Sequence, residues 1–371
     1  MGGDWTTVVD TEDVDPEDLL EHFDRAWFRG REYRHLTDAR HGVERGTALV
    51  GDAVVRGFPS IPRALVLETA VPAQFDGPVT VEEKLNGYNV RVARIDGDLL
   101  AFTRRGYVCP YTTAAIEELL GPTAFFEDHP ERMLCGEVVG PENPYTTHDY
   151  AEVDSVGFYV FDVRDRATGD PMAPERRRAV CAEYDLAAVP HYGTFDPAEA
   201  ATAVHEVLAD LDERGREGVV LKSMDGRQAL KYTTSAIHRA DLEHAFSLPF
   251  DYGRDFVFTR VIREAFQAVE RGEDPETVRQ RGRDLGESIL APAVETIRAV
   301  ADDELVGESH TVRGDPAVLD ALLSYFRDQG LQVEIDRDES ENGDRVVEFT
   351  KVARATQDKT EYYLEGGTVD E

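Results

Sequence analysis

Lysine is scarce in this chain, and its few positions indicate where nitrogen chemistry is needed. Only five of the 40 basic residues are lysine, at positions 84, 222, 231, 351 and 359. A lysine amine can lose its proton when burial or a neighbouring cation lowers its pKa, and the free amine is a nucleophile, whereas a guanidinium stays charged in proteins. A protein that otherwise prefers arginine must therefore keep lysine wherever it needs a nitrogen nucleophile.

The first lysine, Lys84, stands in the run Glu83-Lys84-Leu85-Asn86-Gly87. The preceding β-forming residues and the following glycine predict a strand end and a turn, which would expose the amine. Taken alone, so short a pattern recurs by chance, and a surface strand that ends in a glycine turn explains it better than a catalytic site does.

Five further motifs follow Lys84 in chain order. They supply two more lysines, an arginine pair, carboxylates beside glycine and an aromatic strand: Thr103-Arg104-Arg105-Gly106, Cys135-Gly136-Glu137, Phe158 to Asp162, Glu217 to Lys222, and Ala229 to Tyr232. As an ordered set of six elements, this series is highly specific. It resembles the motifs of the covalent nucleotidyltransferase superfamily, which comprises polynucleotide ligases and mRNA capping enzymes.

A closer resemblance is carried by four longer signatures. These are EKLNGYNVR, TRRGYVCPYTT, GEVVGPENPY and EGVVLKS. With the helical and α+β tail they are similar to the archaeal ATP-dependent RNA ligases, over nearly the whole chain and most strongly from about Arg45 to Thr234. Members of that family adenylate a lysine with ATP, pass AMP to the 5′-phosphate of RNA, and seal that end to a 3′-hydroxyl.

The resemblance implies a role for each cation of the motifs. Lys84 would form the phosphoramidate with AMP, Lys222 and Lys231 would contact the α-phosphate, and Arg104 would hold ribose or phosphate. These roles make physical sense because phosphoryl transfer depends on neutralising charge around the phosphorus and on an in-line nucleophile rather than on elaborate acid-base groups.

The resemblance also implies roles for two carboxylates and an aromatic ring. Glu137 matches a carboxylate on the ribose and Glu217 one that orients the metal, and both are candidate ligands for Mg²⁺ or Mn²⁺, since hard oxygen donors suit such ions. Phe161 would stack on adenine, although a buried strand would use it as core. Glu137 and Glu217 could equally be solvated strand-end carboxylates, but the adjacent glycines 136 and 218 suggest close backbone approach to a ligand.

Strand periodicity adds three candidates for the ATP site. Side chains two apart share a face of a strand, so Glu82 lies on the Lys84 face and can reach the adenine rim, while Glu83 should point away. Asn89 and Arg91 share a face of the next strand, and Arg91 is a candidate phosphate contact.

Two asparagines bear on the choice between RNA and DNA as the substrate. Asn89 matches RNA-ligase practice, where DNA ligases commonly place arginine, so it favours RNA. Asn86 stands where the superfamily usually has aspartate, which puts in doubt any role of that carboxylate in steering metal or tuning Lys84.

The formal charge of −34, with a pI near 4.6, is far from that of an ordinary nucleic-acid-binding protein. Excess acid with little lysine is typical of proteins that work in concentrated salt, where the Debye length falls to about 3 Å and surface repulsion is screened. An acidic protein of an ordinary cytoplasm is the alternative. Because counterion release contributes little in molar salt, we expect local arginines to line the RNA path: Arg56, Arg63 and Arg105.

Apolar patterning predicts an α+β fold. Short β-forming runs between Val79 and Lys231, with helices near 174–184 and 197–214, indicate a mostly antiparallel β domain. The resemblance makes this an antiparallel-β nucleotidyltransferase domain, the adenylation domain of ligases, which is ATP-grasp-like. The expected division is an N-terminal domain (1–75), the adenylation domain (76–247), a helical dimerisation domain (248–306) and a small α+β C-terminal domain (307–371).

The flanking segments carry helix signals. The stretch DPEDLLEHFDRAWFRG, with Asp15 and Pro16 as N-cap and first position, predicts one helix in the N-terminal region. Three helices are expected between 256 and 302, followed by β-α-β-β. The apolar stripe Val261, Ala265, Phe266 and Val269 would pair two subunits as a homodimer, or would pack within one subunit.

Three dispersed cysteines without a C-x-x-C pair suggest neither a disulfide framework nor a zinc site. No membrane association is expected, and the location would be the cytoplasm. The leading interpretation is an ATP-dependent RNA ligase that acts on RNA with 5′-phosphate and 3′-OH ends. The alternatives are an ATP-dependent DNA ligase, a capping guanylyltransferase, and a catalytically inactive RNA-binding protein of the same fold.

Overall fold

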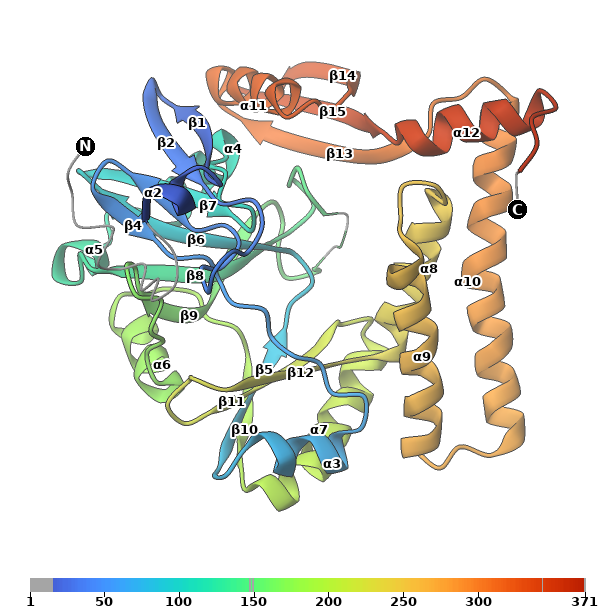
Figure 1. The fold of residues 1–371 in the computed structure, drawn as a ribbon, viewed down its shortest axis with the longest axis horizontal. Coiled ribbons are helices and arrows are strands. Elements are labelled where there is room, and N and C mark those ends of the chain that lie inside the picture. Colours follow the sequence, from blue (N-terminus) through green and yellow to red (C-terminus); the bar gives the residue numbers. More distant parts are fainter. Residues whose placement is uncertain (1–15, 147, 149, 342, 370–371) are drawn as a thin grey trace.

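The computed structural model describes residues 16–146, 148, 150–341 and 343–369. Within them the chain forms four antiparallel sheets with helices packed on and between them (Figure 1). The prediction of an α+β fold built on antiparallel strands is confirmed. Asp15, the expected N-cap, lies outside the described residues.

The described part of the N-terminal region is built on a sheet, and the helix expected over residues 15–30 is short. Within that stretch Pro16–Leu20 is helical (α2), and a four-stranded meander follows: β1 (Asp24–Phe28), β2 (Arg31–His35), β3 (Ala48–Val50) and β4 (Ala53–Val55). The reason is the turn between β1 and β2, where Arg29 and Gly30 both have positive φ, 49° and 77°. Two such residues form the tight turn that joins hairpin strands, so Arg-Gly was the signal missed.

Two four-stranded sheets form the centre of the molecule. We call the first the lysine sheet because it carries Lys84, Lys222 and Lys231, and its strand order is β10 (His191–Phe195), β5 (Val79–Lys84), β11 (Gly218–Ser223) and β12 (Ala229–Thr233). The second sheet has the order β7 (Asp98–Thr103), β6 (Tyr88–Ile95), β8 (Arg132–Val139) and β9 (Gly157–Asp165).

Each central sheet is covered on its outer side. The lysine sheet packs Val81, Val219 and Leu221 against helices α3 (Leu67–Gln74) and α7 (Pro197–Glu213). The second sheet packs Val90 and Val160 against α4 (Pro110–Leu120), α5 (Phe125–Asp128) and α6 (Pro174–Glu183). Its other face shares a core with the N-terminal sheet through Ala93, Ile95 and Phe102. Strict alternation in β5, β11 and β12 leaves the lysine face of the lysine sheet free to form a site.

A helical unit follows: α8 (Ser235–Ser247), α9 (Arg254–Glu270) and α10 (Pro275–Ala301). The two helices expected at 274–302 are one continuous helix, despite Pro292 inside it. A proline within a helix costs about 3 kcal/mol. Here Pro292 is buried, and one turn later Thr296 donates from Oγ1 to the Ser247 carbonyl at the end of α8, 2.7 Å away, so packing on α8 offsets the cost.

The C-terminal segment has the expected β-α-β-β order: β13 (Gly307–Gly314), α11 (Pro316–Asp328), β14 (Val333–Glu341) and β15 (Asp344–Val352), followed by the unpredicted α12 (Arg354–Leu364). Its core includes Cys109 and Tyr111 at the start of α4. Lys351 is part of this joint, because its ammonium donates to the Pro144 carbonyl and lies 5.0 Å from the Tyr145 ring. It is therefore half-buried and held in this joint rather than a bare surface lysine.

No helix of the described residues is long and apolar enough to cross a membrane. The expected division into four domains stays a prediction. The N-terminal sheet shares a core with the second sheet, and the C-terminal unit shares one with Cys109 and Tyr111 at the start of α4, so the parts pack as neighbours through buried apolar side chains.

Candidate active site

A cavity of about 330 Å³ opens between the lysine sheet and the second sheet. Both sheets and the segment before α3 contribute to its wall: Phe58, Pro59, Ile61, Glu82, Glu83, Lys84, Leu85, Asn89, Arg104, Glu137, Phe161, Val189, Val220, Lys222 and Lys231. Sites for small molecules are concave, mostly apolar and carry a few convergent polar groups. This cavity has that character, and it brings together eight of the sequence-predicted site residues.

Lys84 ends β5 on the face that looks into the cavity. Its backbone is paired with Gly218 across the sheet, so Glu217 lies directly beside it. The ammonium donates to Glu217 Oε2 at 2.5 Å, and both side chains are mostly buried. The amine is therefore held by one carboxylate at the edge of the cavity.

Glu82 and Lys222 form a neutralised pair in the cavity wall. Lys222 Nζ lies 3.0 Å from Glu82 Oε2, 3.5 Å from Asp162 and 2.5 Å from the Phe161 carbonyl oxygen. Glu82 is also paired with the buried guanidinium of Arg177. Glu83 is directed to other partners, since it accepts a hydrogen bond from Tyr192 and lies 3.6 Å from Arg216.

Lys231 differs from the other two lysines in having no side-chain hydrogen bond or ion pair within the described part of the chain. Burial first, and then the charges of Arg63 and Lys84, lower its pKa to about 8. Arg104 lies across the cavity, where burial also lowers its pKa and its guanidinium donates weakly to the Pro59 carbonyl at 3.4 Å. Among the described residues that line the cavity, these two cations have no carboxylate within ion-pair distance and can meet an anionic ligand.

Two polar groups of the second sheet face the same space. Asn89 and Glu137 are paired across β6 and β8. Burial raises the pKa of Glu137 to about 7, with the neighbouring Glu217 adding to the rise and Lys84 opposing it. The Asn89 side-chain oxygen is buried without a hydrogen-bond partner in the structure. A buried polar atom without a partner is costly, so a ligand that donates to it would stabilise the site.

The apolar part of the cavity is an aromatic pair. Phe161 meets Phe58 edge to face, with ring centroids 5.1 Å apart. Sequence reasoning did not assign Phe58 a role, because the run RGFPSIPR drew attention only to its arginines. A phenylalanine between glycine and proline in a charged stretch was the available signal.

Arg91, which the sequence analysis made a candidate phosphate contact, does not line the cavity. It is fully buried, and its guanidinium donates to the carbonyl oxygens of Arg56, Gly46 and Thr103 at 2.6, 2.7 and 3.0 Å. The prediction of a shared face with Asn89 was correct, but two residues further along β6 that face is covered by the N-terminal sheet. Arg91 therefore ties the N-terminal region to β6 and does not line the cavity.

The reason expected for glycines 136 and 218, close approach of the backbone to a ligand, is also wrong. A Cβ at position 136 would lie 2.3 Å from the Phe158 ring, and one at 218 would lie 2.2 Å from the Tyr232 carbonyl oxygen. Close approach does explain both residues, but it is approach of protein to protein rather than to a ligand.

The three arginines expected along the RNA path have different surroundings. Arg56 is paired with Glu44 at 2.8 Å, so its charge is already balanced. Arg105 is exposed. Arg63 lies alongside Lys231 and donates to Thr233 Oγ1 at 2.6 Å.

The resemblance implies a divalent metal, and the cavity offers carboxylates that could hold it. No group of three or more histidine, cysteine or acidic side chains among the described residues could hold a metal ion. Glu137 and Glu217 nevertheless fit Mg²⁺, which keeps most of its water and is usually bound by one or two carboxylates together with substrate phosphates. A cation there would lower the charge repulsion around a reacting phosphate.

Comparison with known proteins agrees with this geometry. A family model described as RNA ligase matches residues 77–233, and one described as the C-terminal region of ligase Pab1020 matches 244–367. An uncharacterized protein of Methanocaldococcus jannaschii is 37% identical over 98% of this chain and 96% of its own length.

Solved structures match over the full length as well. One described as archaeal ATP-dependent RNA ligase, form 1, superposes with a TM-score of 0.91 and 36% identity, covering 98% of this chain and 99% of that one. A structure from Aquifex aeolicus, provisionally described as an ATP-dependent DNA ligase, gives 0.89 at 28% identity, covering 96% and 100%.

Fold and cavity thus define a ligase of the nucleotidyltransferase type, with a lysine at the rim of a nucleotide-sized cavity between two antiparallel sheets. The 36% sequence identity to an archaeal ATP-dependent RNA ligase, over 98% of this chain, narrows the class of ligase. The chain belongs to the family of archaeal ATP-dependent RNA ligases.

Proposed function

We propose that this protein joins RNA ends in three steps through a covalent AMP on Lys84. In the first step the deprotonated Nζ attacks the α-phosphorus of ATP. A nitrogen–phosphorus bond forms, the bond between the α-phosphorus and the bridging oxygen breaks, and pyrophosphate leaves. The observation that carries this proposal is the position of Lys84 Nζ at the cavity rim, 2.5 Å from Glu217 and on the same sheet face as Lys222 and Lys231.

The other cavity residues fit the remaining demands of this chemistry. Lys231 and Arg104 supply unpaired positive charge for the α-phosphate. Lys222, paired with Glu82, fixes the wall near Phe161, whose ring with Phe58 offers an apolar face for adenine. Asn89 and Glu137 face the cavity where a ribose hydroxyl could donate to them. Glu217 and Glu137 would hold Mg²⁺ or Mn²⁺.

In the second and third steps the AMP moves and then departs. The 5′-phosphate of RNA attacks the lysyl-AMP and releases the Lys84 amine, and the RNA 3′-OH then attacks the 5′-phosphorus and expels AMP. Whether the two ends belong to one strand decides between a circle and an intermolecular join. The substrate proposed here is single-stranded RNA with 5′-phosphate and 3′-OH ends.

The experiment is to incubate the protein with α-labelled ATP and Mg²⁺ and to locate the label by mass spectrometry. We expect AMP on Lys84, no label in Lys84→Arg because a guanidinium cannot give up its proton, and no label from GTP. Loading with GMP instead would identify a capping-type enzyme, and no label from either nucleotide would identify an inactive RNA-binding protein.

A DNA ligase is the second candidate because of the Aquifex aeolicus structure. The two activities are separated by offering nicked duplex DNA and 5′-phosphorylated single-stranded RNA under the same conditions. Faster sealing of the nick than joining of the RNA would overturn RNA as the substrate.

We further propose that the helical unit pairs two subunits. On α9 the side chains of Ala265, Phe266 and Val269 are exposed, together with Phe258 two turns earlier. An apolar stripe of this kind that no other described element covers is typical of a protein interface.

A further inference from the structure

A row of cations continues from the cavity beyond Lys231. Arg63 lies beside Lys231 through a parallel backbone bridge, and its guanidinium reaches Thr233. Arg263, on α9, is the next cation and interacts electrostatically with Arg63 and Arg260. Arg260 is neutralised by Asp241 at 2.9 Å, but within the described residues no carboxylate pairs with Arg63, Arg263 or Lys231.

Such a row is unfavourable without a bound anion. All three side chains are partly buried, and burial lowers the pKa of each of them. The charge of Arg63 lowers the pKa of Lys231 and of Arg263 further, while the more distant Glu217 opposes the lowering at all three. The chain has almost twice as many acidic as basic residues, 74 against 40, so leaving three clustered cations unpaired is not forced by composition. Guanidinium groups bind phosphate oxygens through paired, charge-assisted hydrogen bonds.

We propose that Arg63 and Arg263, together with Lys231, form a phosphate subsite next to the lysine that reacts. The inference rests on the proposed function and deepens it, because it assigns a second phosphate position. Two phosphates of the reaction could occupy it: the β- and γ-phosphates of ATP, which leave as pyrophosphate, or the 5′-phosphate of the RNA.

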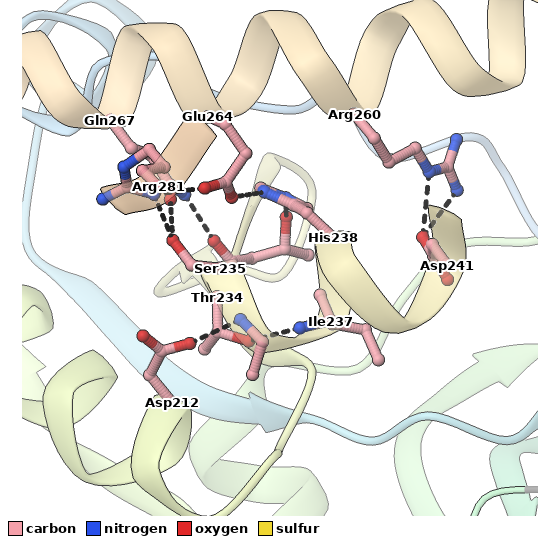
Figure 2. A network of polar contacts seen from close by, with 12 residues as sticks. Asp212, Thr234, Ser235, Ile237, His238, Asp241, Arg260, Glu264, Gln267 and Arg281 are labelled. Carbon is pink, nitrogen blue, oxygen red and sulfur yellow. Dashed lines mark hydrogen bonds and ion pairs between the residues drawn. The ribbon is translucent and has the colours of Figure 1, made fainter. Parts of the chain in front are cut away.

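The orientation of Arg63 is fixed by a row of buried polar side chains, of which Figure 2 shows His238 and Glu264. Thr233 Oγ1, which accepts from Arg63, lies 2.7 Å from His238 Nε2, and His238 Nδ1 lies 2.6 Å from Glu264 Oε1. When Nδ1–H donates to Glu264, Nε2 accepts the Thr233 hydroxyl proton while the threonine oxygen accepts from Arg63. This arrangement requires a neutral imidazole, which agrees with the pKa of His238 being lowered by burial.

This row of hydrogen-bonded side chains continues into the helical unit. Glu264 belongs to α9 and pairs with Arg281 of α10 (Figure 2). Gln267 of α9 donates to the Thr233 backbone carbonyl at 2.7 Å. His238 and Glu264 are almost completely buried. Thr233 and His238 are therefore positioning residues, through which the helices set the direction of a cation at the active site.

The first test is Arg263→Ala in the full-length protein, with Arg254→Ala, an exposed arginine of the same helix, as the control. Four quantities are compared: ATP-dependent loading of Lys84, its reversal by pyrophosphate, AMP transfer from the loaded enzyme to 5′-phosphorylated RNA, and sealing of pre-adenylated RNA. Removing a charged hydrogen bond should weaken one pair of steps roughly tenfold or more.

The pattern of loss identifies the occupant. Loss of loading and reversal assigns the subsite to the ATP polyphosphate, and loss of transfer and sealing assigns it to the RNA 5′-phosphate. If all four rates match those of the control, the subsite is refuted. Thermal stabilisation by inorganic pyrophosphate, compared between wild type and Arg263→Ala, tests the subsite even if wild type never carries AMP, a result that would refute the proposed function instead.

The positioning chain is tested by Thr233→Val, which keeps the shape and removes the oxygen, and by Thr233→Ser, which restores it. Thr233→Val should weaken the same steps as Arg263→Ala, mainly through KM of the affected substrate, and Thr233→Ser should recover them. A lowered melting temperature with unchanged KM would show that Thr233 stabilises the fold but does not position Arg63. If Thr233→Val does not fold, Arg63→Ala provides the comparison, and unchanged steps in that variant would overturn the subsite.

Discussion

At the scale of single residues, positively charged side chains have three different roles in this protein. Lys84 and Lys231 face the cavity, Arg91 is buried under backbone carbonyls, and Lys351 ties the C-terminal unit to the Pro144 segment. The side-chain chemistry decides which amino acid suits each place. An amine is needed where a proton must leave, and a guanidinium where several fixed acceptors must be satisfied at once.

The lowered pKa of Lys231 predicts an alkaline loss of ATP binding. In the free enzyme the ammonium is charged below about pH 8 and neutral above it. Arg63, Lys84 and Arg104 favour the neutral form and Glu217 opposes it. We therefore expect kcat/KM for ATP in the loading step to fall as pH rises through 8.

The matched variant for this prediction is Lys231→Arg, whose guanidinium stays charged throughout that range. Its profile should remain flat across pH 8, at a lower absolute rate if the longer fork fits poorly. An identical alkaline fall in wild type and variant would show that another group titrates.

Arg91→Met should destabilise the fold without a selective effect on ATP. The side chain that satisfies the carbonyls of residues 46, 56 and 103 disappears, and its own buried volume is roughly retained. We expect a loss of about 3 kcal/mol or more in the free energy of unfolding, measured by denaturant titration. The control is Arg94→Met on the same strand. The Arg94 guanidinium lies 4.0 Å from the exposed carboxylate of Glu127, so this variant should change the free energy of unfolding by less than about 1 kcal/mol. Equal effects of the two variants would contradict the structural role of Arg91.

At the scale of elements, strand alternation organises the site and the helical unit connects it to the rest of the protein. Cleft-facing residues of β5, β11 and β12 carry the lysines, and the intervening residues pack on α3 and α7. The helical unit reaches the same sheet through Gln267 and His238. On α9 it carries an exposed apolar stripe that includes Phe258, Phe266 and Val269.

The exposed apolar stripe on α9 predicts a dimer that substitutions in the stripe would dissociate. Val269 is 81% exposed and Phe266 42%. Replacing Val269 and Phe266 together with aspartate should convert a dimer into a monomer in light scattering at working salt, while the melting temperature changes little because neither side chain is in the core. A wild-type protein that is already monomeric at assay concentrations would refute the dimer.

Periodicity failed where a local signal outweighed it. The N-terminal stretch has helix-like apolar spacing, but the Arg29-Gly30 turn makes its second half a hairpin strand. Two helices were expected between 274 and 302, yet packing of Pro292 and Thr296 near α8 accompanies one continuous helix. At the N-terminal stretch a tight turn outweighs helix propensities of tenths of a kcal/mol per residue, and at Pro292 packing on α8 offsets a proline cost of about 3 kcal/mol.

At the scale of the whole molecule, the charge of −34 predicts dependence on salt. Raising KCl from about 0.1 M to about 2 M shortens the Debye length from about 10 Å to less than 3 Å, so repulsion among exposed carboxylates is screened. We expect the melting temperature to rise over this range. Sodium chloride at equal ionic strength should act similarly, and a maximum of stability at low salt would remove the salt-adapted interpretation.

The sequence by itself determined the order of the motifs, the antiparallel α+β class and the face of the strand on which each candidate lies, because side-chain alternation is a local property of the backbone. Only the tertiary structure decided which of those faces reach the cavity. Asn89 and Arg91 share one face, but the N-terminal sheet covers Arg91 and leaves Asn89 open. Phe58, Arg263 and the His238 chain come from segments far apart in sequence, and no spacing rule links them, since their proximity arises from how sheets and helices pack.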